Sequence, residues 1–316
     1  MNRFTTAVGR FFTYLFHFGP RLTWFYIVYP RFAGRKGIMR RHEEIKRWIR
    51  KEFAQVLASY KERPFVSELP EEKFPPPPIW VCWLQGEKQM PETVRKCYRS
   101  VLANAAGRAV ILVTEQNVGD FVSIPAFITE KVRKGEMSRT HYADYLRILL
   151  LKNHGGLWID STVFVTDEIT VDRGLDFYSV RQDPASIYYV SQYRWAVWLL
   201  GCSARCGSYM FGCLEELFRT YLSRKSVFVD FFLFDYFIAA MYEELPQVRG
   251  LIDRVPYNST SCEELISLLN SPYDENLMMS ITNRSIFHKL TWKKDFDLRT
   301  DDGRETFFGV INRLYE

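Results

Sequence analysis

Several patterns that define common protein classes are missing from this sequence of 316 residues. The six cysteines include no Cys-x-x-Cys pair, and Cys202 and Cys206 have no second cysteine or histidine pair at zinc-site spacing. Scattered free thiols are typical of a reducing cytosol and not of a disulfide-stabilised secreted protein. No Gly-x-Gly-x-x-Gly motif follows the first predicted strand, which excludes the usual dinucleotide-binding fingerprint.

Long uninterrupted apolar segments are missing as well. Residues 11–29 are very aromatic, but Gly19, Pro20 and Arg21 interrupt them. A membrane-spanning helix needs about 20 consecutive apolar residues. The segment also lacks the small-residue cleavage site of a signal peptide. It fits an element that lies in a membrane interface, with aromatic rings at the headgroup level, or else a pair of ordinary core-packing elements.

Positive charge is concentrated at the start of the chain. Residues 1–63 contain 14 Lys and Arg against 4 Asp and Glu, a net charge of +10, which leaves −5 for the remaining residues. A phospholipid membrane surface is the expected partner and nucleic acid is not, because no nucleic-acid-binding motif accompanies the charge. We therefore expect a cytoplasmic protein, peripheral at the inner face of the cell membrane.

The sequence divides into three parts. Residues 1–63 form the basic aromatic extension, in which residues 38–60 read as an amphipathic helix that either packs on the body or extends the membrane contact. Residues 64–78 are a Pro-rich linker that ends in four consecutive prolines, the clearest domain boundary. Residues 79–316 form the body, and the hydrophobic content of 47% predicts a sizeable core.

Strands and helices alternate at the start of the body. A buried strand at 79–84, a helix at 92–103 and a strand at 109–113 predict the start of a parallel, Rossmann-like sheet. A short helix at 125–134 follows. Beyond residue 166 the pattern predicts short strands near 177–181, 187–191 and 195–200, and helices near 208–223 and 229–244.

A helix that carries charged residues is predicted between the short helix at 125–134 and the glycines at 155–156. Ser138 or Thr140 can cap its N-terminus, and the glycines at 155–156 end it, because glycine takes the left-handed C-terminal position at little cost. Asp144 and Arg147 are three residues apart, so they are neighbours on the face opposite the apolar one. They form either part of a site or an ordinary solvated ion pair.

A buried strand at 157–159 follows this helix and ends on Asp160. Open α/β sheets bind ligands at the C-terminal ends of their strands, so the helix and the strand are expected to aim two aspartates and an arginine at a common space. The alternative is that Asp160 only begins a turn.

These residues resemble the core signature of the capsular polysaccharide synthesis glycosyltransferases, which are related to mannosyltransferases and glucosylating toxins of the D-x-D type. The resemblance covers about residues 79–294. It rests on the Asp144-x-x-Arg147 pair, on Gly155-Gly156, and on the strand end Asp160-Ser161-Thr162. Thr162 replaces the second carboxylate of the D-x-D motif.

The resemblance implies a GT-A-like α/β fold, a Rossmann-like mixed sheet flanked by helices, with a nucleotide-sugar half at 79–166 and an acceptor half at 167–316. It implies transfer of a sugar, with retention of configuration, from a nucleotide-sugar donor to a growing capsular or other surface polysaccharide. The acceptor is expected to be a lipid-linked glycan. The alternatives are a sugar-phosphate transferase of capsule synthesis and a non-catalytic donor-binding scaffold.

Roles in this reaction are expected for a small set of residues. Asp160, Asp144 and Arg147 are the predicted catalytic residues, and the predicted donor contacts are Trp83, Asp144, Arg147, Gly156, Asp160 and Thr162. A divalent metal, Mn²⁺ or Mg²⁺, is expected on Asp160 and His288. Alternatively, Lys289 or Lys293 neutralises the phosphate directly.

Simple structural explanations also exist for three of the predicted site residues. Trp83 is either the tryptophan that stacks on the nucleobase or a core residue of its strand. His288 is either a metal ligand or a surface histidine. Asp230 lies on the acceptor side or only caps the helix predicted at 229–244.

Overall fold

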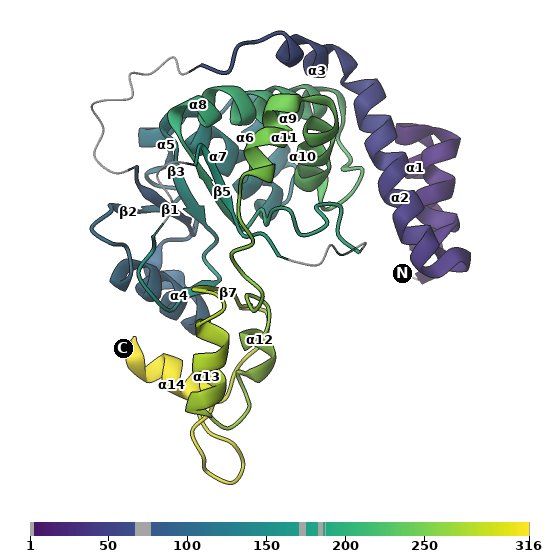
Figure 1. The fold of residues 1–316 in the computed structure, drawn as a ribbon. Coiled ribbons are helices and arrows are strands. Elements are labelled where there is room, and N and C mark those ends of the chain that lie inside the picture. Colours follow the sequence, from purple (N-terminus) through teal and green to yellow (C-terminus); the bar gives the residue numbers. More distant parts are fainter. Residues whose placement is uncertain (1–2, 67–76, 171–174, 183–185, 187, 316) are drawn as a thin grey trace.

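The computed structural model describes residues 3–66, 77–170, 175–182, 186 and 188–315, with side chains from residue 8 onward. Its body is a mixed α/β structure in which helices flank a five-stranded sheet, as expected. Figure 1 shows the N-terminal helices on one side of the body and the C-terminal helices in a lobe at its other end. The predicted linker at 64–78 falls mostly outside the described residues.

The main sheet has the strand order β2-β1-β3-β6-β5. The three strands β1, β2 and β3 are parallel, and β6 runs antiparallel to its neighbours β3 and β5. A second sheet pairs β4 with β7, antiparallel. The strands are β1 (Ile79–Cys82), β2 (Val110–Val113), β3 (Gly156–Ile159), β4 (Val163–Val165), β5 (Phe177–Ser179), β6 (Leu199–Cys202) and β7 (Phe287–Lys289).

Helices cover the sheet and extend the molecule at both ends (Figure 1). The first group is α1 (Arg3–Thr23), the π-helix η1 (Trp24–Val28), α2 (Pro30–Glu52), α3 (Ala54–Lys61), the short 3₁₀ helix η2 (Glu87–Gln89), α4 (Glu92–Ala103), α5 (Val118–Phe121), α6 (Ala126–Arg133) and α7 (Arg139–His154). The second is α8 (Ala204–Cys206), the π-helix η3 (Gly207–Phe211), α9 (Gly212–Arg224), α10 (Leu233–Glu244), α11 (Pro246–Asp253), α12 (Leu265–Leu268), α13 (Glu275–Thr282) and α14 (Phe307–Leu314).

Helix α7 and strand β3 form the unit that the sequence predicts. Ser138 caps α7, because its hydroxyl accepts the His141 N–H at 3.2 Å. Gly155, at φ +62°, ends the helix, and β3 begins at Gly156. Asp144 and Arg147 are both buried, because other elements cover α7 on that side as well, so they are not the ordinary solvated ion pair of the alternative reading.

The helices of residues 1–63 pack on the body. Side chains of α1, α2 and α3 join the same hydrophobic core as α7, α9 and α10. Among them, Ile45, Ile49 and Leu57 are almost completely buried. Of the two possibilities that the sequence left open for residues 38–60, packing on the body is therefore the one that the structure shows.

Three predicted elements differ in the structure. Residues 188–194 form turns, not the strand predicted at 187–191; residue 187 itself lies outside the described residues. The strand predicted at 195–200 begins only at Leu199, and the helix predicted from 229 begins at Leu233. The main sheet contains strands from both sides of residue 166, because β6 pairs with β3. The two predicted halves therefore share one sheet.

Candidate functional site

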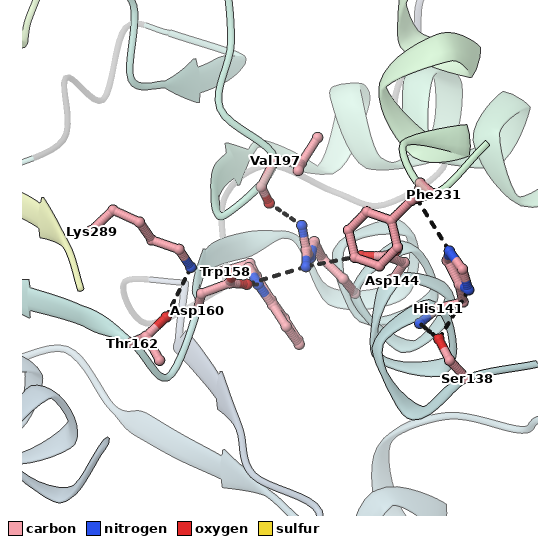
Figure 2. Close-up of polar contacts among 10 residues, drawn as sticks. Ser138, His141, Asp144, Trp158, Asp160, Thr162, Val197, Phe231 and Lys289 are labelled. Atoms are coloured by element: carbon pink, nitrogen blue, oxygen red, sulfur yellow. Dashed lines mark hydrogen bonds and ion pairs between the residues drawn. The ribbon is translucent and has the colours of Figure 1, made fainter. Parts of the chain in front are cut away.

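The candidate site lies where the parallel strands end. Asp160 directly follows β3, next to the C-terminal end of β1. Helix α7 packs beside this edge and supplies Arg147, which contacts both aspartates. It also supplies Asp144 (Figure 2). The expectation that these three side chains share one space is confirmed by their contacts. The site therefore occupies the place at which open α/β sheets bind ligands.

Both carboxylate oxygens of Asp160 accept hydrogen bonds. Its Oδ1 accepts from Trp158 Nε1 at 2.8 Å and from Arg147 Nη2 at 3.1 Å. Its Oδ2 accepts from Lys289 Nζ at 2.7 Å. Burial alone would raise the pKa of Asp160, but the Lys289 ammonium and the Arg147 guanidinium together outweigh it and hold this pKa below its ordinary value. Asp160 is therefore an anion at neutral pH.

Arg147 links the helix, the strand and a loop. Its Nη2 donates to Asp144 Oδ1 at 3.2 Å as well as to Asp160, and its Nη1 donates to the carbonyl oxygen of Val197. The guanidinium also lies over the Trp158 ring, 4.8 Å from its centroid. Because only 5% of its side chain is exposed, Arg147 is a fixed part of the site and not a solvated surface charge.

The pKa of Asp144 is shifted in the opposite direction from that of Asp160. Burial is the main cause that raises the pKa of Asp144, to about 6; Arg147 lowers it and the neighbouring Asp160 charge raises it further. The two carboxyl groups thus hold their protons with different strength although they share one guanidinium. At slightly acidic pH Asp144 carries a proton while Asp160 does not.

Strand β7 brings Lys289 into the site. Lys289 pairs with Val163 of β4, and its Nζ donates to Asp160 Oδ2 and, at 2.9 Å, to Thr162 Oγ1 (Figure 2). The neighbouring His288 pairs with Phe164 and points to the other face, because side chains alternate along a strand. His288 is fully buried, its Nε2 lies 3.4 Å from Thr166 Oγ1, and burial lowers its pKa to about 4.

The predicted metal site does not fit the residues at this position. Asp160 is already bound to two cations, and His288 is not a neighbour that could complete a ligand set. Among the residues that the structure describes, no group of three or more His, Cys, Asp or Glu side chains is placed to hold a metal ion. Lys289, one of the two cations that the sequence suggests as an alternative to a metal, contacts Asp160.

The predicted donor contact Gly156 and the predicted acceptor-side residue Asp230 both lie away from the Asp160 cluster. Gly156 begins β3, at the opposite end of the strand from Asp160. A Cβ atom there would lie 2.4 Å from the Pro78 carbonyl oxygen, so the close approach of the chain before β1 explains this glycine. Asp230 accepts the Phe232 N–H at 2.9 Å before α10 begins, and lines a different cavity, beside Arg10.

Trp83 follows β1 and is only partly buried. Its Nε1 donates to the Gln89 carbonyl oxygen at 3.3 Å, and its ring meets the Trp292 ring edge-on, with centroids 5.9 Å apart. Trp292 follows β7, so the segment that carries Lys289 also approaches Trp83. The role of Trp83 in stacking on a nucleobase stays a prediction.

A small aromatic cavity adjoins the Asp160 cluster. Its volume is about 160 Å³, and its lining includes Arg41, His42, Tyr188, Trp195, Trp198 and Asp235. The segment that forms one wall contacts the cluster through its backbone: Val197 accepts from Arg147, and Trp198 accepts the Asp160 N–H at 2.9 Å. Sequence reasoning missed this cavity, although the density of aromatic residues at 188–198 was a visible signal.

Asp235 is the buried carboxyl group of this cavity. Its Oδ1 accepts from Trp195 Nε1 at 2.9 Å. Burial raises the pKa of Asp235 to about 7, against the lowering effect of the Trp195 hydrogen bond. A carboxyl group with this pKa can take up or release a proton near neutral pH.

Together, an α/β sheet, a strand-end aspartate and an adjoining aromatic cavity define a protein with a ligand site at the edge of its sheet. The family model of the capsular polysaccharide synthesis proteins matches residues 27–311, and the chain belongs to this family. The expected resemblance to the capsular polysaccharide synthesis proteins is thereby confirmed, and a role in capsular polysaccharide synthesis follows from it. The relation to mannosyltransferases and glucosylating toxins stays a prediction. No curated protein and no solved structure matches the chain.

Proposed function

We propose that this protein is a glycosyltransferase that moves a sugar from a nucleotide-sugar donor to a growing capsular glycan. The observation that carries the proposal is the convergence of Arg147 and Lys289 on Asp160 at the ligand-binding edge of the sheet, beside the aromatic cavity. Membership of the capsular polysaccharide synthesis family supports the same reaction class. Retention of configuration is part of the proposal and rests on the resemblance alone.

The donor is proposed to bind over Asp160, with its base toward Trp83 and its diphosphate near Lys289. Such a transfer needs groups that hold the donor hydroxyls and groups that neutralise the leaving diphosphate. Asp160 is held as an anion by its neighbours, so it can accept hydrogen bonds from sugar hydroxyls. Arg147 fixes the direction of this carboxylate by its simultaneous contacts with Asp144 and the Val197 carbonyl.

The acceptor sugar is proposed to enter the aromatic cavity. Ligand pockets typically combine apolar and aromatic walls with a few polar groups that fix orientation, and this cavity has Trp195 and Trp198 beside Asp235. In the reaction, the acceptor oxygen bonds to the anomeric carbon on the face from which the phosphate leaves, and the bond from that carbon to the phosphate oxygen breaks, so the configuration is retained. The proton of the acceptor hydroxyl passes to Asp235, whose pKa of about 7 suits this transfer.

The acceptor is proposed to be lipid-linked and to be met at the membrane surface through the N-terminal helices. Aromatic side chains of this segment are exposed, with exposed fractions of 61% for Phe12, 87% for Phe16 and 82% for Phe32. Exposed basic residues accompany them, among them Arg31 and Lys36. Aromatic rings with cations suit an anionic membrane interface. No helix among the described residues is long and apolar enough to cross a membrane.

The test is turnover with a panel of UDP-, GDP-, CMP- and dTDP-sugars and membrane-extracted acceptor. We expect one donor to release its nucleoside product only when acceptor is present, and Asp160→Asn to lose this activity. Asparagine can still accept from Trp158, so the fold should survive, and the exposed Asp301→Asn is the matched control. Full activity of Asp160→Asn would contradict the proposal.

The same assay separates the rival functions. Release of a nucleoside monophosphate from a diphosphate-linked donor would identify a sugar-phosphate transferase. Donor binding without turnover, for every donor and acceptor preparation, would identify a donor-binding scaffold.

A further inference from the structure

The Lys289 ammonium contacts the carboxylate on which the sequence predicts a divalent cation. The ammonium bridges the first and third residues of the turn 160–162, at 2.7 Å from Asp160 Oδ2 and 2.9 Å from Thr162 Oγ1 (Figure 2). The third residue of that turn is the one at which the second carboxylate is missing. The amine therefore contacts both ends of the turn that carries the variant D-x-D motif.

The position of Lys289 is set by the backbone. Strand β7 pairs with β4, and the pairing places Lys289 opposite Val163. The Lys289 N–H donates to the Cys262 carbonyl oxygen at 2.7 Å, and the Leu290 N–H donates to the Thr162 carbonyl oxygen at 2.8 Å. The first bond holds β7 against the segment at Cys262 and the second holds it against the turn, so the amine contact with Thr162 does not depend on a mobile surface chain.

The charges around Asp160 favour an anion as ligand. Arg147 and Lys289 both contact this carboxylate, and a divalent cation would have to approach two positive groups at close range. A lysine ammonium has three N–H donors, of which the two described bonds use two. The third can point to a ligand, since 26% of the Lys289 side chain is exposed.

We propose that Lys289 replaces the divalent metal and that this site binds the diphosphate of its donor without a metal ion. The inference rests on the proposed function. When the bond from the anomeric carbon to the phosphate oxygen breaks, its electron pair stays on that oxygen, and the ammonium of Lys289 stabilises the resulting charge. The incoming acceptor oxygen takes the place of the phosphate on the sugar, and its proton passes to Asp235.

The first experiment measures binding of UDP, GDP, CDP, dTDP and inorganic pyrophosphate to the full chain, in excess EDTA and again with Mg²⁺ or Mn²⁺. We expect one nucleoside diphosphate to bind with the same Kd, within about twofold, in both conditions. Loss of a charge-assisted contact should weaken this binding in Lys289→Ala by about 10- to 100-fold. The exposed Lys294→Ala, from the same segment, should bind as the unaltered chain does.

A second variant keeps the test decisive if Lys289→Ala unfolds. In Lys289→Gln the side chain stays polar and keeps N–H donors on the side of Asp160, but the positive charge is gone. The fold of each variant is checked by its thermal unfolding transition. We expect Lys289→Gln to unfold near the temperature of the unaltered chain and to lose diphosphate binding as Lys289→Ala does.

The double variant Lys289→Ala/Thr162→Asp restores two carboxylates to the turn and removes the competing cation. We expect its nucleotide binding to require Mn²⁺ or Mg²⁺. Binding by the unaltered chain that disappears in EDTA and returns with Mn²⁺ would overturn the inference and leave the proposed function standing. A folded protein that binds no nucleotide in either condition would overturn both.

Discussion

Asp144 and Asp160 contact the same guanidinium yet hold their protons differently. The pKa of Asp144 is raised to about 6, mainly by burial, whereas the second cation, Lys289, helps to hold the pKa of Asp160 low. The two side chains are chemically identical, but their pKa values differ, in part because only Asp160 contacts Lys289. Sequence spacing alone could place the two aspartates together but could not distinguish them, because Lys289 comes from a strand 129 residues away.

Arg147 should be the residue whose loss most damages the site. Arg147→Met keeps much of the apolar side chain but leaves Asp144 without its charge partner and the Val197 carbonyl oxygen without its donor. Breaking a buried ion pair costs about 3 kcal/mol or more. We expect this loss in the free energy of unfolding at pH 7, measured by urea denaturation. Arg219→Met, an exposed arginine paired with Glu215 on α9, should cost less than about 1 kcal/mol.

Asp235 gives a prediction about pH. Its folded pKa of about 7 lies above the ordinary value of 3.8, so protonation favours the folded state. This stabilisation is complete below about pH 4 and is lost as the pH rises through 7. Asp235→Asn removes the buried charge and can still accept from Trp195. Relative to the unaltered chain, the variant should therefore gain about 2–4 kcal/mol in unfolding free energy between pH 4 and pH 8.

A chemical denaturation series at these pH values makes the measurement. A difference between the two proteins that stays constant over this range would contradict the raised pKa. The same variant should also lose turnover if Asp235 accepts the proton, by about 10²-fold or more.

At the scale of elements, the sequence predicted best where local signals decide the structure. The cap at Ser138 and the glycines after His154 define α7, and the apolar run after them defines β3. The strand predicted near 187–191 was wrong, because Tyr188, Tyr189 and Val190 form a short apolar run of the kind that is typical of a strand. Here the aromatic side chains line a cavity instead. The pairing of β7 with β4 joins segments far apart in the sequence, and no local pattern encodes it.

The junction between α7 and β3 should tolerate no side chain at Gly156. Its φ of +98° is strained for any other residue, and a Cβ atom would meet the Pro78 carbonyl oxygen. We expect Gly156→Ala to lower the unfolding free energy by about 2–4 kcal/mol, or to prevent folding, as judged by thermal unfolding. Gly250→Ala is the control: it lies in α11 with open space around its Cβ position, and should be neutral or stabilising by up to about 1 kcal/mol.

At the scale of the whole molecule, the N-terminal helices take part in the aromatic cavity that we propose as the acceptor site. Helix α2 contributes Arg41 and His42 to the aromatic cavity, and His42 Nδ1 lies 2.6 Å from the Tyr236 hydroxyl of α10. The helices also share the main core with the body. Deleting residues 1–63 would therefore expose core side chains, and a membrane test needs substitutions at the surface instead.

The last prediction uses such substitutions to test membrane binding. The exposed rings of Phe12, Phe16 and Phe32 contribute nothing to the buried core, so replacing all three with serine should leave the unfolding temperature nearly unchanged. Each removes an aromatic contact with the interface, and we expect binding to vesicles that contain anionic phosphatidylglycerol to fall at least tenfold in a sedimentation assay. The matched control replaces Leu277, Met279 and Leu314, exposed apolar residues of the C-terminal lobe, and should bind as before. Equal losses in both triple variants would mean that vesicle binding depends on general surface hydrophobicity. Unchanged binding of the phenylalanine variant would exclude the N-terminal helices as the membrane contact.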